Sequence, residues 1–126
     1  MNTSNDHIVQ AEYNEGVFLY LQSVAGRYQD WQVTCLHYAA LHWVDAYLHQ
    51  LNPPAGIRPR THGERLRLVE THFGTSLMVD YRELQDRSQD ARYEGHKFTD
   101  AQVSAWYTSQ FARIRTHVRT ALALPL

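Results

Sequence analysis

The sequence contains a single cysteine, Cys35, so no disulfide bond can form within the chain. Disulfide frameworks are typical of small secreted domains, and a lone cysteine in an apolar stretch is expected to be a reduced, buried side chain. A secretion signal is also lacking, because residues 1–10 combine no basic segment with an apolar run. We therefore expect a cytoplasmic protein.

Long hydrophobic runs are missing as well. No segment approaches the ~18 consecutive apolar residues of a membrane span, so we expect a soluble protein with no membrane partner. The alternation of apolar and polar residues that marks β-strands is also lacking. With 126 residues the chain fits one domain, 1–126, whose core needs neither a disulfide nor a cofactor. The predicted fold class is all-α.

Lysine is nearly absent, since eleven of the twelve basic residues are arginine and the other is Lys97. The planar guanidinium group matches phosphate geometry, although a solvated, arginine-rich surface explains the same composition. Residues 1–57 hold one basic residue against five acids, whereas residues 58–126 hold eleven against eight. A polyanionic partner should therefore meet the C-terminal half.

Helical spacing of apolar residues first appears between Ile8 and Val24, and Gly26 marks the exit from this predicted helix. From Asp30 a second segment is apolar on nearly every face and is stopped by Pro53 and Pro54. We expect this second helix to be the central, most buried one.

Three further helices are predicted downstream. A capping box, Thr61-x-x-Glu64, opens a short helix that ends at Gly74, and a fourth helix follows from about Ser76 to about Asp90. A second capping box at Thr99 opens a long amphipathic helix that keeps its 3.6-residue period to Pro125. The predicted architecture is an up-and-down bundle of four main helices plus a short extra helix.

A polar linker, ARYEGHKF, is predicted between the fourth helix and the last, and it carries Arg92 and His96. An arginine can hold a phosphate group while a histidine transfers protons, which together could cleave RNA without a metal ion. The alternative is purely structural. Arg92 would then pair with an acidic residue at the helix end, Tyr93 would pack in the core, and His96 would be a solvated loop residue. The acidic candidates are Asp86, Asp90 and Glu94.

Three short motifs occur in order on these helices: His37-Tyr38-Ala39-Ala40-Leu41-His42, Pro59-Arg60-Thr61-His62 and Gln89-Asp90-Ala91-Arg92-Tyr93. In order and spacing they resemble the HEPN family, small all-helical bundles that include RNA-cutting toxins and defence effectors. The resemblance covers about residues 30–122. It implies a HEPN-like protein of a prokaryotic toxin–antitoxin or antiviral defence system, acting on RNA as a metal-independent endoribonuclease, and a homodimer as the assembly.

The resemblance also implies a catalytic site. Catalytic members use an arginine followed, after four to six residues, by a histidine, which here assigns catalysis to Arg92 and His96. Arg87, Tyr93 and Lys97 are the predicted substrate-binding residues. The two catalytic candidates are separated by only three residues. This shortened spacing favours the alternative of a non-catalytic HEPN-like interaction module that dimerises and binds a partner, such as a nucleotidyltransferase antitoxin or a larger effector.

One face of the central helix carries His42, Asp45 and His49, at positions i, i+3 and i+7. Helical bundles bind metals with such residues, but further ligands would have to come from other helices. The sequence offers four loose candidates: His7, His37, His62 and His72. We therefore predict no metal site. In the alternatives, His42 hydrogen-bonds inside the core with Asp45 orienting it, or His42 points toward the linker of Arg92.

Large aromatic residues at helical spacing are expected in the core or at an interface rather than as platforms for stacking bases. They are Trp31, Trp43, Tyr47, Trp106 and Tyr107. Because Trp43 and Tyr47 lie one turn apart on a nearly all-apolar helix, we expect part of that surface to pack on another chain.

Overall fold

The structure is a computed structural model that describes residues 3–24, 26–95 and 97–126. All regular secondary structure in these ranges is helical, as predicted, and no described residue belongs to a strand. The helices are α1 (Ser4–Gln22), α2 (Gln29–Leu48), α3 (His62–Phe73), α4 (Thr75–Tyr93), α5 (Asp100–Trp106), the π-helical segment η1 (Tyr107–Phe111) and α6 (Ala112–Ala121).

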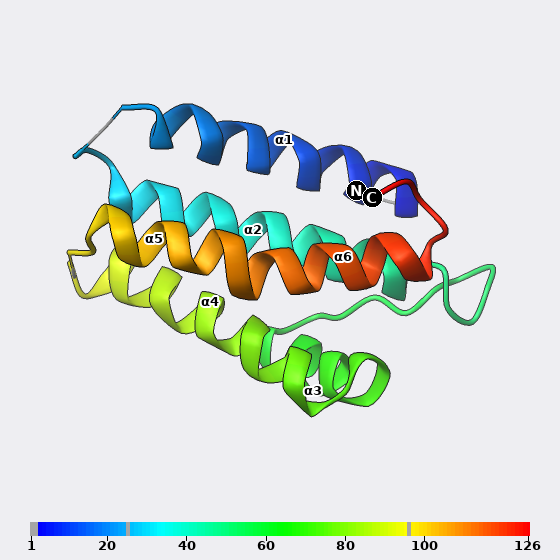
Figure 1. Cartoon of the computed structure of the whole chain (residues 1–126). Helices are drawn as coiled ribbons and strands as arrows, with labels where there is room; N and C mark the ends of the chain where they lie inside the picture. Colours follow the sequence, from blue (N-terminus) through cyan, green and yellow to red (C-terminus); the bar gives the residue numbers. More distant parts are fainter. Residues whose placement is uncertain (1–2, 25, 96) are drawn as a thin grey trace.

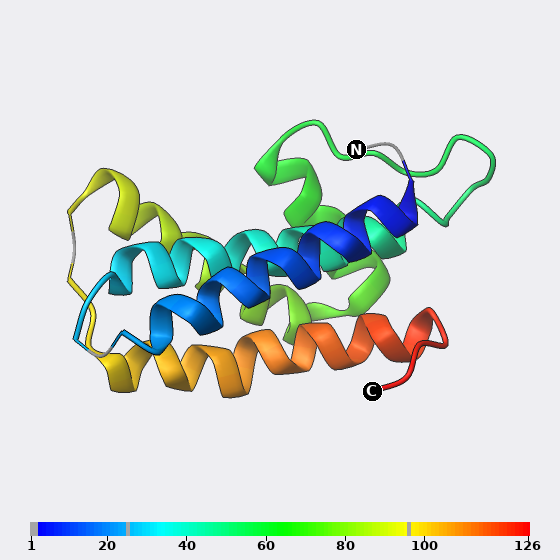
Figure 2. The ribbon, with the colours of Figure 1, turned by 90° about the horizontal axis from the view of Figure 1, so that it is seen from above.

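The bundle is organised around α2, which packs against α1, α4 and the segments of the last helix (Figures 1 and 2). The short helix α3 packs on α4. Thirteen of the twenty residues of α2 are buried, because this helix is apolar on nearly every face. The prediction of a central helix and of a bundle with a short extra helix is therefore confirmed. None of the described helices is long and apolar enough to cross a lipid bilayer.

Three of the helices, α1, α3 and α5, start at side-chain caps. Thr3 and Asp6 form a reciprocal capping box that starts α1, and Thr99 forms another with Gln102 at the start of α5. At α3, the hydroxyl of Thr61 accepts a hydrogen bond from the amide of Glu64 at 3.0 Å. The predicted capping box at Thr99 is confirmed, whereas Thr61 caps α3 without the reciprocal bond from Glu64 in the described residues. The box at Thr3 was not predicted, because the first helix was assigned from apolar periodicity alone.

The end of α4 differs from the prediction. This helix continues past Asp90 to Tyr93, so Arg92 and Tyr93 lie on its last turn and not in a linker. Ala91 is buried against the core, which makes the added turn favourable. Gly95 then adopts a left-handed conformation with φ of 64°, which ends the helix as glycine commonly does.

The last helix is also not uniform, because η1 interrupts the predicted 3.6-residue period. At this segment the hydroxyl of Tyr107 donates to Glu15 of α1 at 2.6 Å, and Arg115 pairs with the same carboxylate. The Tyr107 ring also packs on Phe18, with centroids 4.7 Å apart. A π-helical segment adds a residue to a turn, so it changes which side chains face α1.

Two predictions about burial need correction. Trp43 is fully buried within the chain, so it cannot belong to an interface, and Tyr47 packs on Phe73 of α3. Cys35 is half-buried rather than buried, and desolvation raises the pKa of its thiol. The large apolar side chains left exposed lie elsewhere, notably along α1.

Candidate functional site

Arg92 is held in place by neutral groups. Its Nη1 donates to the hydroxyl of Tyr38 at 2.9 Å and its Nε donates to the carbonyl of Ser88 at 3.3 Å. The guanidinium group also lies over the rings of Tyr38 and Tyr93, at 5.4 and 5.0 Å from the ring centroids. It is therefore ordered by contacts that leave its positive charge uncompensated.

The alternative in which Arg92 pairs with an acidic residue at the helix end is wrong. No carboxylate in the described ranges pairs with this arginine; Asp90 instead accepts from Arg87, at 3.2 Å. Tyr93 does not pack in the core, since 77% of it is exposed. Both differences have one cause: the extra helical turn points Arg92 back toward α2 and Tyr93 outward.

A hollow of about 300 Å³ lies at this end of the bundle, lined by Asp30, Trp31, Thr34, Ala91 and Arg92. It adjoins a second hollow of about 460 Å³, because Asp30 and Trp31 line both. The second hollow adds Arg27 and Lys97. Trp31 is 57% exposed, so of the two predicted locations, core or interface, the core is excluded.

Three of the predicted site residues thus gather at one end of the bundle: Arg92, Tyr93 and Lys97. Arg87 lines neither hollow and is engaged by Glu83 and Asp90 along its own helix. His96 lies outside the described residues. Arg27, Tyr28 and Trp31, which the sequence analysis did not assign, join the group from the turn before α2 and its first turn. The sequence pattern that could have indicated them lies next to a helix start: a tyrosine, a tryptophan and the only arginine or lysine of the first 57 residues.

His37 lies behind Arg92 in the interior. It is fully buried, and neither ring nitrogen has a hydrogen-bond partner among the described residues. Its ring centroid is 5.7 Å from that of Tyr81 and 6.2 Å from that of His62. Burial lowers the pKa of His37 from 6.5 to about 3, and the nearby charges of His62 and Arg92 act in the same direction. His37 is therefore neutral at pH 7.

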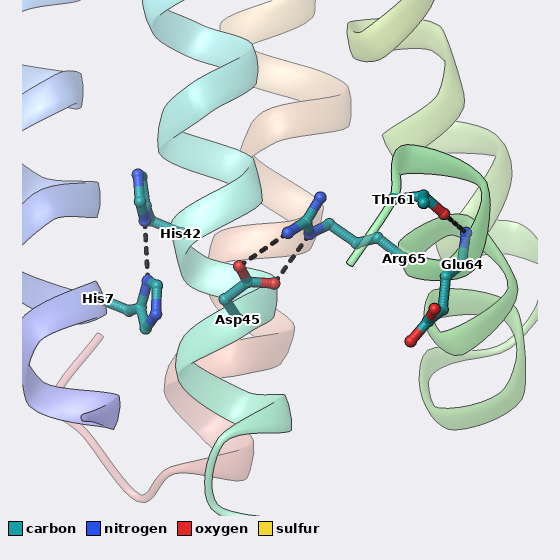
Figure 3. A network of polar contacts seen from close by, with 6 residues as sticks. All are labelled: His7, His42, Asp45, Thr61, Glu64 and Arg65. Carbon is teal, nitrogen blue, oxygen red and sulfur yellow. Dashed lines mark hydrogen bonds and ion pairs between the residues drawn. The ribbon is translucent and has the colours of Figure 1, made fainter. Parts of the chain in front are cut away.

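A second polar cluster lies near the other end of α2 (Figure 3). Asp45 accepts two hydrogen bonds from Arg65, from Nε at 2.9 Å and from Nη2 at 3.1 Å, and both side chains are nearly inaccessible. Arg65 lies on the first turn of α3, which the Thr61 cap starts, and its side chain reaches Asp45 of α2 from there. Such a bidentate pair fixes the carboxylate in one orientation.

Three histidines complete the cluster: His7 of α1, His42 of α2, and His49 at the C-cap of α2. The Nδ1 atoms of His7 and His42 are 2.8 Å apart, and the ring of His7 meets that of His49 edge-on, with centroids 4.4 Å apart. The hydrogen bond predicted for His42 is present, but its partner is His7, and Asp45 binds Arg65 instead of orienting His42. The other alternative, in which His42 points toward the linker of Arg92, is wrong, because Tyr38 is the residue of α2 that contacts Arg92.

Sequence reasoning placed His42, Asp45 and His49 on one face but missed how Arg65 joins them. The signal was available, since a carboxylate on the most apolar helix requires a cation from another element. His7 was one of four loose candidates, and only the packing of α1 on α2 selects it. His37 and His62 face the Arg92 side instead.

We predict that His37 makes stability depend on pH. Its pKa is lowered on folding, so between pH 6.5 and 3 the unfolded chain binds a proton that the folded chain does not. The free energy of unfolding therefore decreases as the pH is lowered through this range. From pH 7 to pH 5 this group alone should remove about 2 kcal/mol. In His37→Leu this contribution should vanish, as urea unfolding at the two pH values would measure.

The matched control for this test is Val33→Ala, a buried change on the same helix that should lower stability equally at both pH values. An unchanged pH dependence in His37→Leu would show that His37 is not buried in its neutral form.

Comparison with known protein families, with curated protein sequences and with solved structures gave no match. The resemblance to HEPN proteins therefore remains a prediction from the motifs, and what the chain does is argued from its own residues. Those residues form two clusters on α2, one around Arg92 at its beginning and one around Asp45 near its end.

Proposed function

We propose that this chain is a HEPN-like protein of a prokaryotic toxin–antitoxin or antiviral defence system that acts on RNA at the end of the bundle around Arg92. The observation that carries the proposal is the guanidinium group of Arg92. It is ordered by Tyr38 and Ser88, lines a hollow, and has no carboxylate partner in the described part of the chain. An ordered, uncompensated arginine is a ready phosphate clamp.

The surroundings of Arg92 support a single-stranded nucleic acid as the ligand. Tyr28, Trp31 and Tyr93 are exposed aromatic side chains at this end of the bundle, and exposed aromatic rings are platforms on which bases stack. Arg27 and Lys97 line the adjoining hollow and can contact neighbouring phosphates. Asp30 lines both hollows, so the site is not uniformly basic.

The proposed reaction is cleavage of RNA without a metal ion. A base removes the proton from a 2′-hydroxyl, the resulting oxygen attacks the adjacent phosphorus, and the leaving 5′-oxygen takes up a proton. Arg92 would stabilise the negative charge that develops on the phosphorane. His96 is the proposed group for one proton transfer, and the second copy in a homodimer would supply another.

The test is cleavage of a labelled mixed-sequence RNA by the full chain in EDTA, with product ends analysed. We expect 2′,3′-cyclic ends, and a loss of rate of about 100-fold in Arg92→Ala. The matched control is Arg82→Ala, which removes an exposed arginine from the same helix and should leave the rate unchanged. Equal loss in both variants would indicate only a general charge effect, and intact RNA with the wild type would remove the ribonuclease proposal.

A second candidate function, a non-catalytic interaction module, is favoured by the outer face of α1. Val9, Tyr13 and Tyr20 recur at helical spacing on one stripe and are 69%, 65% and 71% exposed. Contiguous exposed apolar residues mark interaction surfaces. The proposed occupant is a second copy of this chain, so that the two α1 helices meet. The alternative partner for this surface of α1 is an antitoxin or a larger effector protein.

Sedimentation analysis would test this surface. We expect a dimer for the wild type and a monomer for the double variant Tyr13→Lys/Tyr20→Lys, because two buried charges would oppose each other across the interface. Tyr93→Lys, which changes an exposed tyrosine on another helix, should remain dimeric. A monomeric wild type, or a dimer unaffected by the double variant, would rule out self-association through α1.

A further inference from the structure

A second site follows from three side chains that the proposed RNA site does not use: His7 of α1, Asp45 of α2, and His49 at the C-cap of α2. One potential ligand atom from each lies within 4.8 Å of the other two. His7 and Asp45 are each only 5% exposed, while His49 is half-exposed. The cluster is thus enclosed by the packing of α1 on α2 and reachable from solvent on the side of His49.

Two nitrogen atoms in this cluster have lost water without gaining a partner. Nε2 of His7 and Nδ1 of His49 are both buried, and neither has a hydrogen bond within the described residues. Leaving such atoms unpaired in an interior is unfavourable, so they require an explanation. A bound cation would provide one, because a neutral histidine nitrogen is a good metal ligand.

The hydrogen bond between His7 and His42 sets the protonation that a ligand needs. With 2.8 Å between the two Nδ1 atoms, one must donate and the other accept. If His7 donates from Nδ1, its Nε2 carries a lone pair, and His42 acts as the partner that orients a ligating histidine.

Asp45 supplies the negatively charged ligand. Arg65 takes up one acceptor position on each of its two oxygens, and each oxygen keeps a further lone pair. The bidentate contact also fixes the plane of the carboxylate, as Figure 3 shows, with His7 on the other side of Asp45 from Arg65. A pre-oriented carboxylate loses little conformational freedom when it binds a cation.

We propose that His7, Asp45 and His49 bind a divalent transition metal of the zinc class. Two imidazoles and a carboxylate are a donor set suited to such ions rather than to Mg²⁺ or Ca²⁺. At ligand distances of ~2.0–2.1 Å, donor atoms around a tetrahedral ion lie about 3.3 Å apart, so the side chains need to close by roughly an ångström. Three protein ligands leave a fourth position open to water or a substrate.

This site is separate from the hollow around Arg92. Asp45 lies eleven positions after Thr34, which lines that hollow, a separation of ~16 Å along the axis of α2. Because the ligands come from two helices, the ion would also tie α1 to α2. Metal binding should therefore raise the unfolding temperature of the protein, since only the folded chain brings the three ligands together.

The experiment is a Co²⁺ titration of the full chain after chelator treatment, followed by visible absorption and then by displacement with Zn²⁺. We expect one equivalent of Co²⁺ to bind with the intense absorption of a four-coordinate site, and Zn²⁺ to displace it. Binding should weaken at least ~10-fold in His49→Gln and in His7→Gln. His72→Gln, a change of a histidine outside the cluster, should bind as the wild type does.

Thermal unfolding with and without Zn²⁺ gives an independent readout. His49 is half-exposed, so His49→Gln should fold, and Zn²⁺ should raise the unfolding temperature of the wild type and of His72→Gln but not of His49→Gln. The proposal is overturned if the wild type binds no stoichiometric Co²⁺. It is equally overturned if His7→Gln and His49→Gln, both folded by circular dichroism, bind it as tightly as the wild type.

Discussion

The ion pair between Asp45 and Arg65 is the interaction on which the arrangement of the bundle depends. Asp45 is a carboxylate on the most apolar helix, and burying an unpaired charge there would be prohibitive. Arg65 satisfies both oxygens from the first turn of α3, which Thr61 caps and which packs on α4. The pair therefore fixes the position of α3 and the orientation of the Asp45 carboxylate together.

Polar side chains on α2 serve different neighbours at its two ends. Near the beginning, Tyr38 orders Arg92 of α4 beside a hollow with exposed aromatic side chains. Near the end, Asp45 and His49 meet His7 of α1 in an enclosed cluster. One helix thus connects the proposed RNA site and the proposed metal site. Since α2 packs on α1, α4 and the last helix, it is the rigid element on which both are built.

Much of the fold could be predicted because its signals are local. The caps at Thr61 and Thr99 and the apolar face of α2 follow from residues close in sequence, and all are present in the structure. The end of α4 was misjudged, because the burial of Ala91 extends the helix up to the turn at Gly95. In the segment η1, Tyr107 bonds to Glu15 of α1, which is 92 positions away, and no local pattern reveals this contact.

The candidate sites were less accessible to prediction, because long-range packing decides them. Sequence patterns put Arg92 and Tyr93 in the right region, but not the ordering contact with Tyr38 or the exposure of Trp31. They put His42, Asp45 and His49 on one face, but could not select His7 from four candidates or recognise Arg65 as the partner of Asp45. Each of these contacts joins residues at least twenty positions apart.

The most direct test of this account is a double-mutant cycle on Asp45 and Arg65, measured by urea unfolding of Asp45→Asn, Arg65→Met and the double variant. If the pair is buried as described, each single change should lower stability by ~3–5 kcal/mol, and the double variant should lose much less than the sum. The same cycle on Asp80 and Arg113, whose arginine side chain is 54% exposed, should give a smaller coupling. Additive losses at Asp45 and Arg65 would contradict the account.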